Sequence, residues 1–190
     1  MSAKTPDSSD IAVAIPEHIR QRAKRVRLAA FDVDGTLTDG RLWIDGDGRE
    51  NKAYHIHDGL GLKLLQDHGV EVAFITARES PSARARGRDL GIRHVHTAVK
   101  DKRECLQALC AKLGVGLDAA AWMGDDLADL CLFAHVGLSV MPANHHAWLQ
   151  GHAHWTTSAR GGEGAVRELC DLILEQQGHR ETLLKRYGAP

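Results

Sequence analysis

Two aspartates stand at the end of an apolar run near the start of the chain. Asp32 and Asp34 follow "LAAF" in the segment "LAAFDVDGTLTDG", and Gly35 then breaks the pattern. A buried carboxylate without a partner is costly, so two of them at one strand end need a cation, a shared proton or a catalytic role. One aspartate can attack a phosphorus atom while a second, kept protonated, donates a proton to the leaving oxygen and later activates water.

Other polar side chains follow other apolar runs. They are Thr76 after "VEVAFI", Lys100 and Lys102 after "RHVHT", and Asp125, Asp126 and Asp129 after "AAWMG". Ligands of parallel sheets bind at the carboxyl ends of the strands, so we expect these residues to share one rim with the first two aspartates. Magnesium takes carboxylate oxygens together with substrate phosphate, and a lysine neutralises phosphate charge. The set therefore predicts a magnesium and phosphate site.

The elements that position these residues alternate along the chain. Strands are expected at 28–32, 70–76, 93–97, 119–124, 136–140 and 154–157, and helices at 58–68, 81–90, 102–113, 126–133 and 164–177, after a short basic helix in 16–27. This alternation predicts an α/β fold, a doubly wound, Rossmann-like parallel sheet with helices on both faces. We expect one domain over residues 19–178, a disordered N-terminus at 1–18 and a C-terminal tail at 179–190.

A β-hairpin flap is predicted over about 41–57, directly after the first strand. Gly46-Asp47-Gly48 lies between the strand-like runs "RLWID" and "ENKAYHI", which is a strong hairpin signal. Asp58 is then expected to cap the next helix, and Asn144 a short later one. The hairpin is rich in apolar residues, namely Leu42, Trp43, Ile44, Tyr54 and Ile56. Because a free flap should not expose so many, we expect homo-oligomerisation through it.

Composition narrows the function classes. The chain has 190 residues, is 43% hydrophobic and carries a formal net charge of −1, so no basic field recruits nucleic acid or a membrane surface. The four cysteines show no C-x-x-C spacing, which argues against a disulfide framework or a zinc site and favours a cytoplasmic location. With no apolar run long enough for a membrane span or a leader, we expect a protein that is neither inserted nor exported.

Four motifs carry a family resemblance. "DVDGTLTDG", "ITAR", Lys102 and "GDDLAD" resemble, in order, the motifs of the haloacid dehalogenase superfamily of phosphohydrolases. More closely, "DGTLTDG", "HDGLGLKLL", "GDDLADL", "VGLSV" and "GGEGAVREL" are similar to 3-deoxy-D-manno-octulosonate 8-phosphate phosphatases, from about residue 23 to about 175. The resemblance implies a small, homotetrameric, magnesium-dependent phosphoric monoester hydrolase of lipopolysaccharide precursor synthesis. No cap domain fits between the motifs, so we expect a capless enzyme with an open site.

The resemblance also implies roles for individual residues. Asp32 is expected to be the nucleophile, Asp34 the general acid/base, Thr76 a phosphoryl ligand, and Lys102 the lysine that holds nucleophile and phosphate together. The expected magnesium ligands are Asp32, the backbone carbonyl of Asp34, and Asp125, with Asp126 supporting the metal site and Asp129 orienting the loop. Lys100 is a competing candidate for Lys102, because both lie near the same strand end.

Substrate choice depends on two further positions. Arg78 matches the arginine that the resemblance places against the carboxylate of the eight-carbon sugar acid, where phosphatases of nine-carbon sugar acid 9-phosphates tend to be acidic. Ala77 replaces the family's usual glycine, and Glu163 stands where many octulosonate phosphatases have arginine. A nine-carbon sugar acid 9-phosphate, or another small phosphate monoester, therefore remains the alternative substrate.

Other functions fit the sequence less well. A phospho-accepting receiver domain of a signalling protein also has an acidic magnesium site with Thr and Lys, but its acceptor follows a later strand and nothing there matches Asp34. The spacing after Asp32 is not that of a calcium loop, since Leu37 and Trp43 stand where Gly and Glu are needed. "GGEGAVRE" lacks the G-K-[ST] of a phosphate-binding P-loop. The twelve histidines lack the spacing of a transition-metal site, so we interpret them as surface or interface residues.

Overall fold

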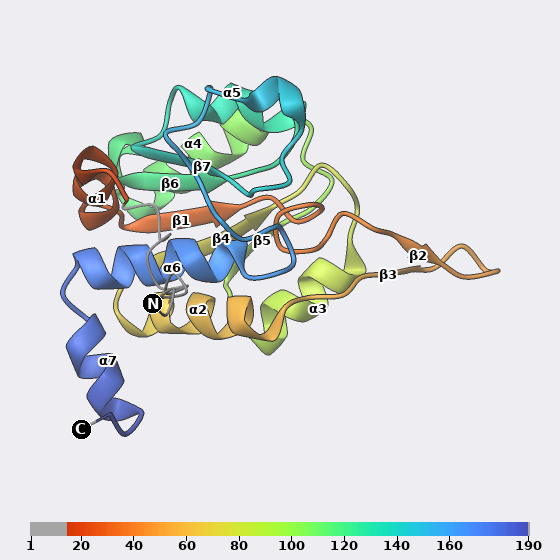
Figure 1. Ribbon diagram of the computed structural model, residues 1–190. Helices are drawn as coiled ribbons and strands as arrows, with labels where there is room; N and C mark the ends of the chain where they lie inside the picture. Colours follow the sequence, from red (N-terminus) through yellow and green to blue (C-terminus); the bar gives the residue numbers. More distant parts are fainter. Residues whose placement is uncertain (1–14, 190) are drawn as a thin grey trace, which may run out of the picture.

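A six-stranded parallel sheet forms the centre of the molecule (Figure 1). The computed structural model describes residues 15–189. The strand order of the sheet is β5-β4-β1-β6-β7-β8, and all neighbouring pairs are parallel. The strands are β1 (Leu28–Phe31), β4 (Glu71–Ile75), β5 (His94–His96), β6 (Ala120–Met123), β7 (Leu138–Met141) and β8 (Trp155–Thr156). The expected Rossmann-like α/β architecture is confirmed.

Helices cover both faces of this sheet. They are α1 (Glu17–Lys24), α2 (Ile56–Asp67), α3 (Pro81–Asp89), α4 (Lys102–Leu113), α5 (Leu130–Phe133), α6 (Ala165–Gln176) and α7 (Arg180–Arg186). Buried side chains of α1, α2, α3 and α6 pack with one face, and those of α4 and α5 with the other. Among the described residues, no helix combines the length and the apolar character that a membrane span requires.

The central strand β1 fixes the direction in which the first aspartate points. Its four residues are fully buried and alternate between the two cores, with Ala29 and Phe31 on the α2 and α6 side and Leu28 and Ala30 on the α4 side. Side chains alternate along a strand, so Asp32 continues the second row and lies on the α4 side. The backbone of Asp32 stays in the sheet, since its N–H donates to the carbonyl of Met123.

The chain order reverses beside β1, which creates a crevice at the carboxyl ends of the strands. From β1 the chain moves outward through β4 and β5, then returns to place β6 on the other side of β1. Phe31 pairs with Phe74 of β4 and with Met123 of β6, so the three strands end level with one another. Their following loops therefore meet at the topological switch point, where ligands of such sheets bind.

The hairpin is present but shorter than predicted. Strands β2 (Trp43–Ile44) and β3 (Glu50–Asn51) pair antiparallel around the Asp45–Arg49 turn, and the hairpin projects beyond the sheet (Figure 1). The remainder of "ENKAYHI" is not a strand, because α2 already begins at Ile56. Trp43 and Ile44, which form strand β2 of the hairpin, are 65% and 63% exposed.

Two predicted helix caps are wrong. Asp58 lies in the first turn of α2, whose N-cap is His55, and its buried carboxylate instead accepts from the backbone N–H of Arg167 at the start of α6 (2.8 Å). Asn144 caps no helix, since its side chain accepts from the N–H of Gly161 and the short helix Ala147–Leu149 is capped by His146. In both cases the side chain bonds to a residue distant in the sequence, whereas the local sequence pattern predicts a bond within its own helix.

The chain ends differ from the prediction in part. Helix α1 already includes Glu17 and His18, and the predicted tail forms helix α7, which packs on the rest of the chain through Leu183. The predicted disorder of the preceding segment falls on residues 1–14, which lie outside the described part of the chain.

Candidate active site

A buried lysine joins two aspartates at the end of β1. The Nζ atom of Lys102, the first residue of α4, lies 2.7 Å from Oδ1 of Asp32 and 2.7 Å from Oδ1 of Asp129. Helix α4 begins here because the carboxylate of Asp101 caps it, accepting from the N–H of Glu104. All three charged side chains are nearly inaccessible to solvent. The strand end and the helix start thus hold one ammonium directly beside Asp32.

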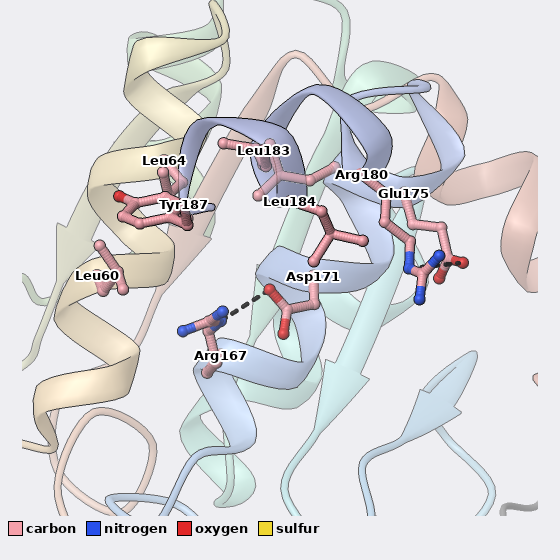
Figure 2. Close-up of a pocket in the computed structure, with 10 residues that line it drawn as sticks. Leu60, Leu64, Arg167, Asp171, Glu175, Arg180, Leu183, Leu184 and Tyr187 are labelled. Atoms are coloured by element: carbon pink, nitrogen blue, oxygen red, sulfur yellow. Dashed lines mark hydrogen bonds and ion pairs between the residues drawn. The ribbon is translucent and has the colours of Figure 1, made fainter. Parts of the chain in front are cut away.

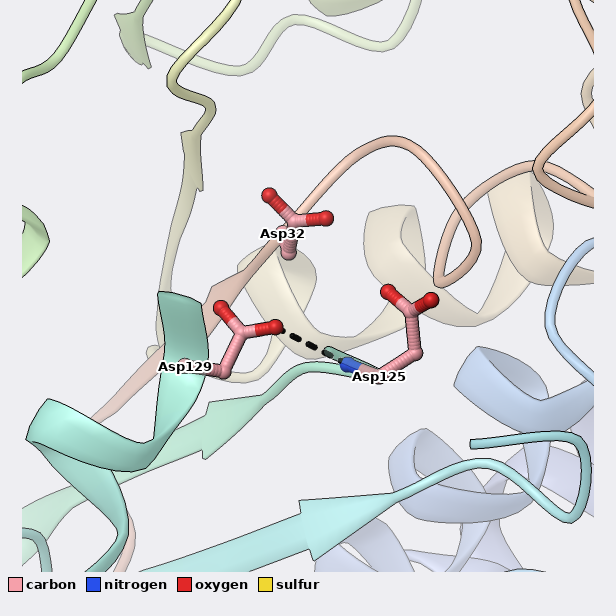
Figure 3. Close-up of side chains that lie close together, drawn as sticks. All are labelled: Asp32, Asp125 and Asp129. Atoms are coloured by element: carbon pink, nitrogen blue, oxygen red, sulfur yellow. Dashed lines mark hydrogen bonds between the residues drawn. The ribbon is translucent and has the colours of Figure 1, made fainter. Parts of the chain in front are cut away.

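Asp125 completes an acidic cluster on the neighbouring strand end (Figure 3). One carboxylate oxygen from each of Asp32, Asp125 and Asp129 lies within 4.8 Å of the other two. Asp129 is held in place because its Oδ2 accepts from the backbone N–H groups of Asp125 and Asp126. Within residues 15–189, these three aspartates are the one group of three or more side chains suited to hold a metal ion.

The loop after β1 is built to touch Asp125. Gly35 has a φ of +91°, and a Cβ atom there would lie 2.0 Å from Oδ2 of Asp125, so only glycine fits. The next residue, Thr36, donates its hydroxyl to Oδ1 of Asp125 (3.2 Å). Gly35, which breaks the apolar pattern of the first strand, therefore also lets the backbone approach Asp125 closely.

The cluster holds more negative charge than its single lysine balances. Burial, reinforced by Asp129, raises the pKa of Asp32 to about 7 even though Lys102 opposes the shift. Burial and the charges of Asp32 and Asp129 likewise raise the pKa of Asp125 to about 7. Burial lowers the pKa of Lys102, but the two carboxylates outweigh it and the net shift is upward. Three carboxylates against one ammonium suit a hard divalent cation, so the residues fit magnesium.

Asp34 points to a second lysine, which sequence analysis did not single out. Nζ of Lys52 lies 2.6 Å from Oδ1 of Asp34 as an ion pair. Both oxygens of Asp34 and the Nζ of Lys52 are buried, and none has a partner with the geometry of a hydrogen bond. Lys52 belongs to the segment that returns from the hairpin. The sequence holds a signal for this contact, because polar side chains stand at every second position of this segment, at Glu50, Lys52 and Tyr54, as on one face of an extended chain.

Thr76 and Arg78 lie in the loop after β4. Thr76 is buried, its backbone N–H continues the sheet by donating to the carbonyl of His96, and its hydroxyl accepts from the N–H of Arg78 (3.2 Å). The guanidinium of Arg78 is about half exposed and forms an ion pair with Glu50 in strand β3 of the hairpin. Arg78 therefore has a carboxylate partner within the chain.

Two predicted candidates have side chains that lie outside the cluster. Lys100 is exposed, whereas Lys102 reaches Asp32, so the geometry separates the two lysines that the sequence left open. Asp126 is exposed, and its carboxylate caps the turn Leu127–Asp129 by accepting from the N–H of Leu127 (2.7 Å). The side chain of Asp126 thus shapes the loop that carries Asp125 and Asp129, and its contact with the cluster is the backbone N–H that donates to Oδ2 of Asp129 (3.1 Å).

The glycine-rich loop packs against the loop after β1. A Cβ atom on Gly161 would lie 1.7 Å from the carbonyl oxygen of Gly35, and the N–H of Gly162 donates to the carbonyl of Thr36 (3.0 Å). Glu163 is mostly exposed and lies 3.8 Å from Arg160 in an ion pair. The loop's glycines therefore hold the Asp34 loop in place, while the side chain of Glu163 has a local cation.

A separate hollow of about 510 Å³ lies between α2, α6 and α7 (Figure 2). It is lined mainly by apolar residues and holds none of the predicted site residues. The histidines also stay outside the acidic cluster, and two of them, His55 and His57, lie at the start of α2 as its N-cap and its second residue.

The fold and the site define a class of protein. A Rossmann-like sheet with an acidic cluster after its central strand, a lysine at a helix start and a buried threonine after the next strand is the arrangement of haloacid dehalogenase-like hydrolases, and that family matches residues 94–169. A relative from Yersinia pestis, a 3-deoxy-D-manno-octulosonate 8-phosphate phosphatase, is 40% identical over 88% of this chain and 89% of its own. The chain belongs to the 3-deoxy-D-manno-octulosonate 8-phosphate phosphatase family, which confirms the resemblance.

Solved structures agree with this placement. A hypothetical protein from Xanthomonas campestris superposes with a TM-score of 0.90 at 52% identity, covering 94% of this chain and 97% of its own. The 3-deoxy-D-manno-octulosonate 8-phosphate phosphatase of Moraxella catarrhalis, in complex with magnesium, phosphate and the sugar acid, gives a TM-score of 0.86 at 38% identity, covering 89% and 97%. The Haemophilus influenzae phosphatase, in a cobalt-bound form, gives 0.80 at 37% identity, covering 83% and 92%.

Proposed function

We propose that this chain is a magnesium-dependent phosphatase that hydrolyses 3-deoxy-D-manno-octulosonate 8-phosphate to the free sugar acid and phosphate, in lipopolysaccharide precursor synthesis. The observation that carries the proposal is the buried cluster of Asp32, Asp125 and Asp129 around Lys102, in a chain of this family. Its excess negative charge calls for a cation, and its position at the topological switch point suits a phosphate ester.

In the proposed first step, Asp32 is the nucleophile. A carboxylate oxygen of Asp32 attacks phosphorus and forms an aspartyl-phosphate, while the bond from phosphorus to the sugar oxygen breaks. Asp34 gives its proton to that oxygen, so the sugar acid leaves neutral at that position. Lys102 orients Asp32 and neutralises phosphoryl charge, and Thr76 offers its hydroxyl to a phosphoryl oxygen. Burial of these groups strengthens each charge interaction.

In the proposed second step, water hydrolyses the aspartyl-phosphate, with Asp34 as the general base and Asp32 as the leaving group. Asp34, now ionised, takes a proton from water, and the water oxygen attacks the phosphorus of the aspartyl-phosphate. The bond between Asp32 and phosphorus breaks, which releases phosphate and restores both aspartates. Asp32, Asp125 and the backbone carbonyl of Asp34 would hold magnesium, which when bound supplies positive charge for the phosphoryl oxygens. Asp129 keeps Asp125 and Lys102 in place through its hydrogen bonds.

Substrate choice is assigned to Arg78. Its half-exposed guanidinium can exchange Glu50 for the carboxylate of the sugar acid, which it would bind in a bidentate manner. Glu163 supports the alternative, a nine-carbon sugar acid 9-phosphate, because the octulosonate phosphatases often have arginine there.

We also propose a cytoplasmic homotetramer assembled through the hairpin. The exposed Trp43 and Ile44 are apolar side chains in strand β2 of a projecting hairpin, which support burial against another subunit. Light scattering at micromolar concentration is expected to give a tetramer, and Trp43→Glu is expected to dissociate it. A monomeric wild-type protein would overturn this assembly, and cell fractionation tests the location.

The activity is tested by phosphate release from a panel of phosphate esters in magnesium. The panel holds eight- and nine-carbon sugar acid phosphates and generic phosphate monoesters, with Asp32→Asn and Asp34→Asn as controls. We expect the highest kcat/KM on 3-deoxy-D-manno-octulosonate 8-phosphate and no turnover in Asp32→Asn. Equal rates across the panel would remove the substrate assignment, a preference for the nine-carbon ester would favour the alternative, and full activity in Asp32→Asn would remove the mechanism.

A further inference from the structure

The segment that returns from the hairpin contacts the body of the domain through every second side chain. Glu50 pairs with Arg78, Lys52 with Asp34, and the hydroxyl of Tyr54 lies 3.4 Å from Oγ of Ser82. Two of the three contacts are ion pairs, and their partners, Asp34 and Arg78, both belong to the candidate active site. The hairpin is therefore joined to the active site and is not only an arm for assembly.

Lys52 is the most deeply placed of these contacts. Its side chain has no solvent exposure, and within residues 15–189 its one ion-pair partner is Asp34. An ammonium taken out of water is costly unless a carboxylate compensates it, so the chain is built to keep this pair together. Asp34 depends on Lys52 in the same way, because neither of its carboxylate oxygens has a hydrogen-bond donor among the described residues.

The backbone around Asp34 leaves its side chain dependent on such a contact. Asp34 lies beyond the end of β1 and precedes Gly35, whose left-handed conformation turns the chain. The sheet therefore does not fix the orientation of this carboxyl group as it fixes that of Asp32. A proton donor must lie within hydrogen-bond reach of the oxygen it protonates, so an unrestrained carboxyl group would lose efficiency.

We propose that Lys52 is a positioning residue for Asp34: its ammonium holds the carboxyl group of the general acid/base, and the hairpin thereby becomes part of the catalytic site. This inference rests on the role proposed above for Asp34. Lys52 itself transfers no proton, since the proton passes from Asp34 to the leaving oxygen and returns from water. The competing idea is that Lys52 binds the substrate directly, and its experimental signature differs.

The test compares two substrates whose leaving groups differ in basicity. The sugar oxygen of an alkyl phosphate needs protonation as it leaves, whereas the nitrophenolate of p-nitrophenyl phosphate does not. Lys52→Met removes the ammonium at nearly constant length. We expect kcat on the sugar acid phosphate to fall about tenfold or more, since general acid–base catalysis contributes roughly 100- to 10,000-fold. KM should change less than about twofold, because binding contacts are untouched.

A transient measurement separates the two chemical steps. The burst of p-nitrophenolate reports only the attack of Asp32, and we expect Lys52→Met to leave the burst rate close to wild type while slowing the steady state, in which Asp34 must activate water. Lys52→Arg should recover most of the loss because it restores a cation. In the Asp34→Asn background, Lys52→Met should add no further loss.

Arg49→Met is the matched control, because Arg49 is an exposed hairpin cation paired with Asp47 near the turn. Thermal unfolding of each variant separates a folding defect from a catalytic one, and Lys52→Gln replaces Lys52→Met if the latter does not fold. A rise in KM with unchanged kcat, or a full additional loss in Asp34→Asn, would overturn the proposal. If the wild type hydrolyses p-nitrophenyl phosphate through Asp32 but no sugar acid phosphate, the substrate assignment fails while the burst experiment still tests Lys52.

Discussion

Two lysine–aspartate pairs stand side by side in this site and are built in opposite ways. Lys102 and Asp32 come from the start of a helix and the end of the central strand, and Asp129 gives the lysine a second hydrogen bond. Lys52 and Asp34 come from the hairpin and from a turn, and their ion pair lacks aligned hydrogen bonds. The first pair belongs to the rigid core, and the second depends on how the hairpin lies.

The difference corresponds to the two chemical tasks. A nucleophile must meet phosphorus along one line, so a fixed carboxylate serves it well. A general acid/base acts on two different oxygens in succession, that of the leaving sugar and that of water. A carboxyl group held by one ion pair, without hydrogen bonds from the backbone, can adjust between them. The comparison predicts that disturbing the first pair is more damaging than disturbing the second.

The largest effect is expected from Lys102→Met. The change leaves Asp32 and Asp129 buried beside each other without their ammonium, and breaking a buried pair in this way costs about 3–5 kcal/mol. We expect the urea midpoint of the metal-free protein to fall accordingly and turnover to be lost. Lys112→Met, in the last turn of the same helix and exposed, is the control. A midpoint equal to that of the control would show that the rigid pair is not structural.

A second prediction concerns pH and magnesium. The pKa values of Asp32 and Asp125 are both raised to about 7, from the ordinary value of 3.8 for an aspartate. Between these values the folded state binds more protons than the unfolded state, so the stability of the metal-free protein falls as pH rises from about 4 to about 7. Magnesium binds the ionised carboxylates and offsets the repulsion between them, so it has little effect at a pH where they are protonated.

We therefore expect magnesium to raise the melting temperature more at pH 8 than at pH 5.5. Asp125→Asn should raise the melting temperature of the metal-free protein at pH 8 and abolish most of the magnesium effect, and Asp118→Asn, outside the cluster, should do neither. A magnesium shift that is equal at both pH values would contradict the charge account of the rigid pair.

The sequence predicted the rigid half of the site better than the hairpin half. Asp32, Thr76, Lys102 and Asp125 follow strands or begin a helix, and apolar periodicity locates such ends well. Glu50 and Lys52 lie in a segment whose expected strand is mostly irregular, and their partners are distant in the sequence. The wrong prediction that Asp58 caps α2 has the same cause, since only tertiary packing brings the start of α6 to its carboxylate.

A smaller effect is expected from Glu50→Gln, which acts in strand β3 of the hairpin. Glu50 competes with the substrate carboxylate for Arg78, and an exposed ion pair of this kind contributes about 0.2–1 kcal/mol. KM for the sugar acid phosphate should therefore fall by up to about fivefold, with kcat unchanged. KM for p-nitrophenyl phosphate, which has no carboxylate, is the internal control. An increase in KM would show instead that Glu50 aligns Arg78 for the substrate.

The smallest effect is expected from Lys100→Met, which tests whether proximity in sequence is enough. Lys100 precedes Lys102 by two residues and carries the same charge, but its side chain is exposed before α4 begins, whereas that of Lys102 is buried against Asp32. A solvated ammonium outside the cluster adds little because water screens it. We expect kcat/KM within about twofold of wild type, against the loss in Lys102→Met. A comparable loss in both variants would mean that the substrate draws Lys100 into the site, and the rigid pair would then be only half of the phosphate-binding charge.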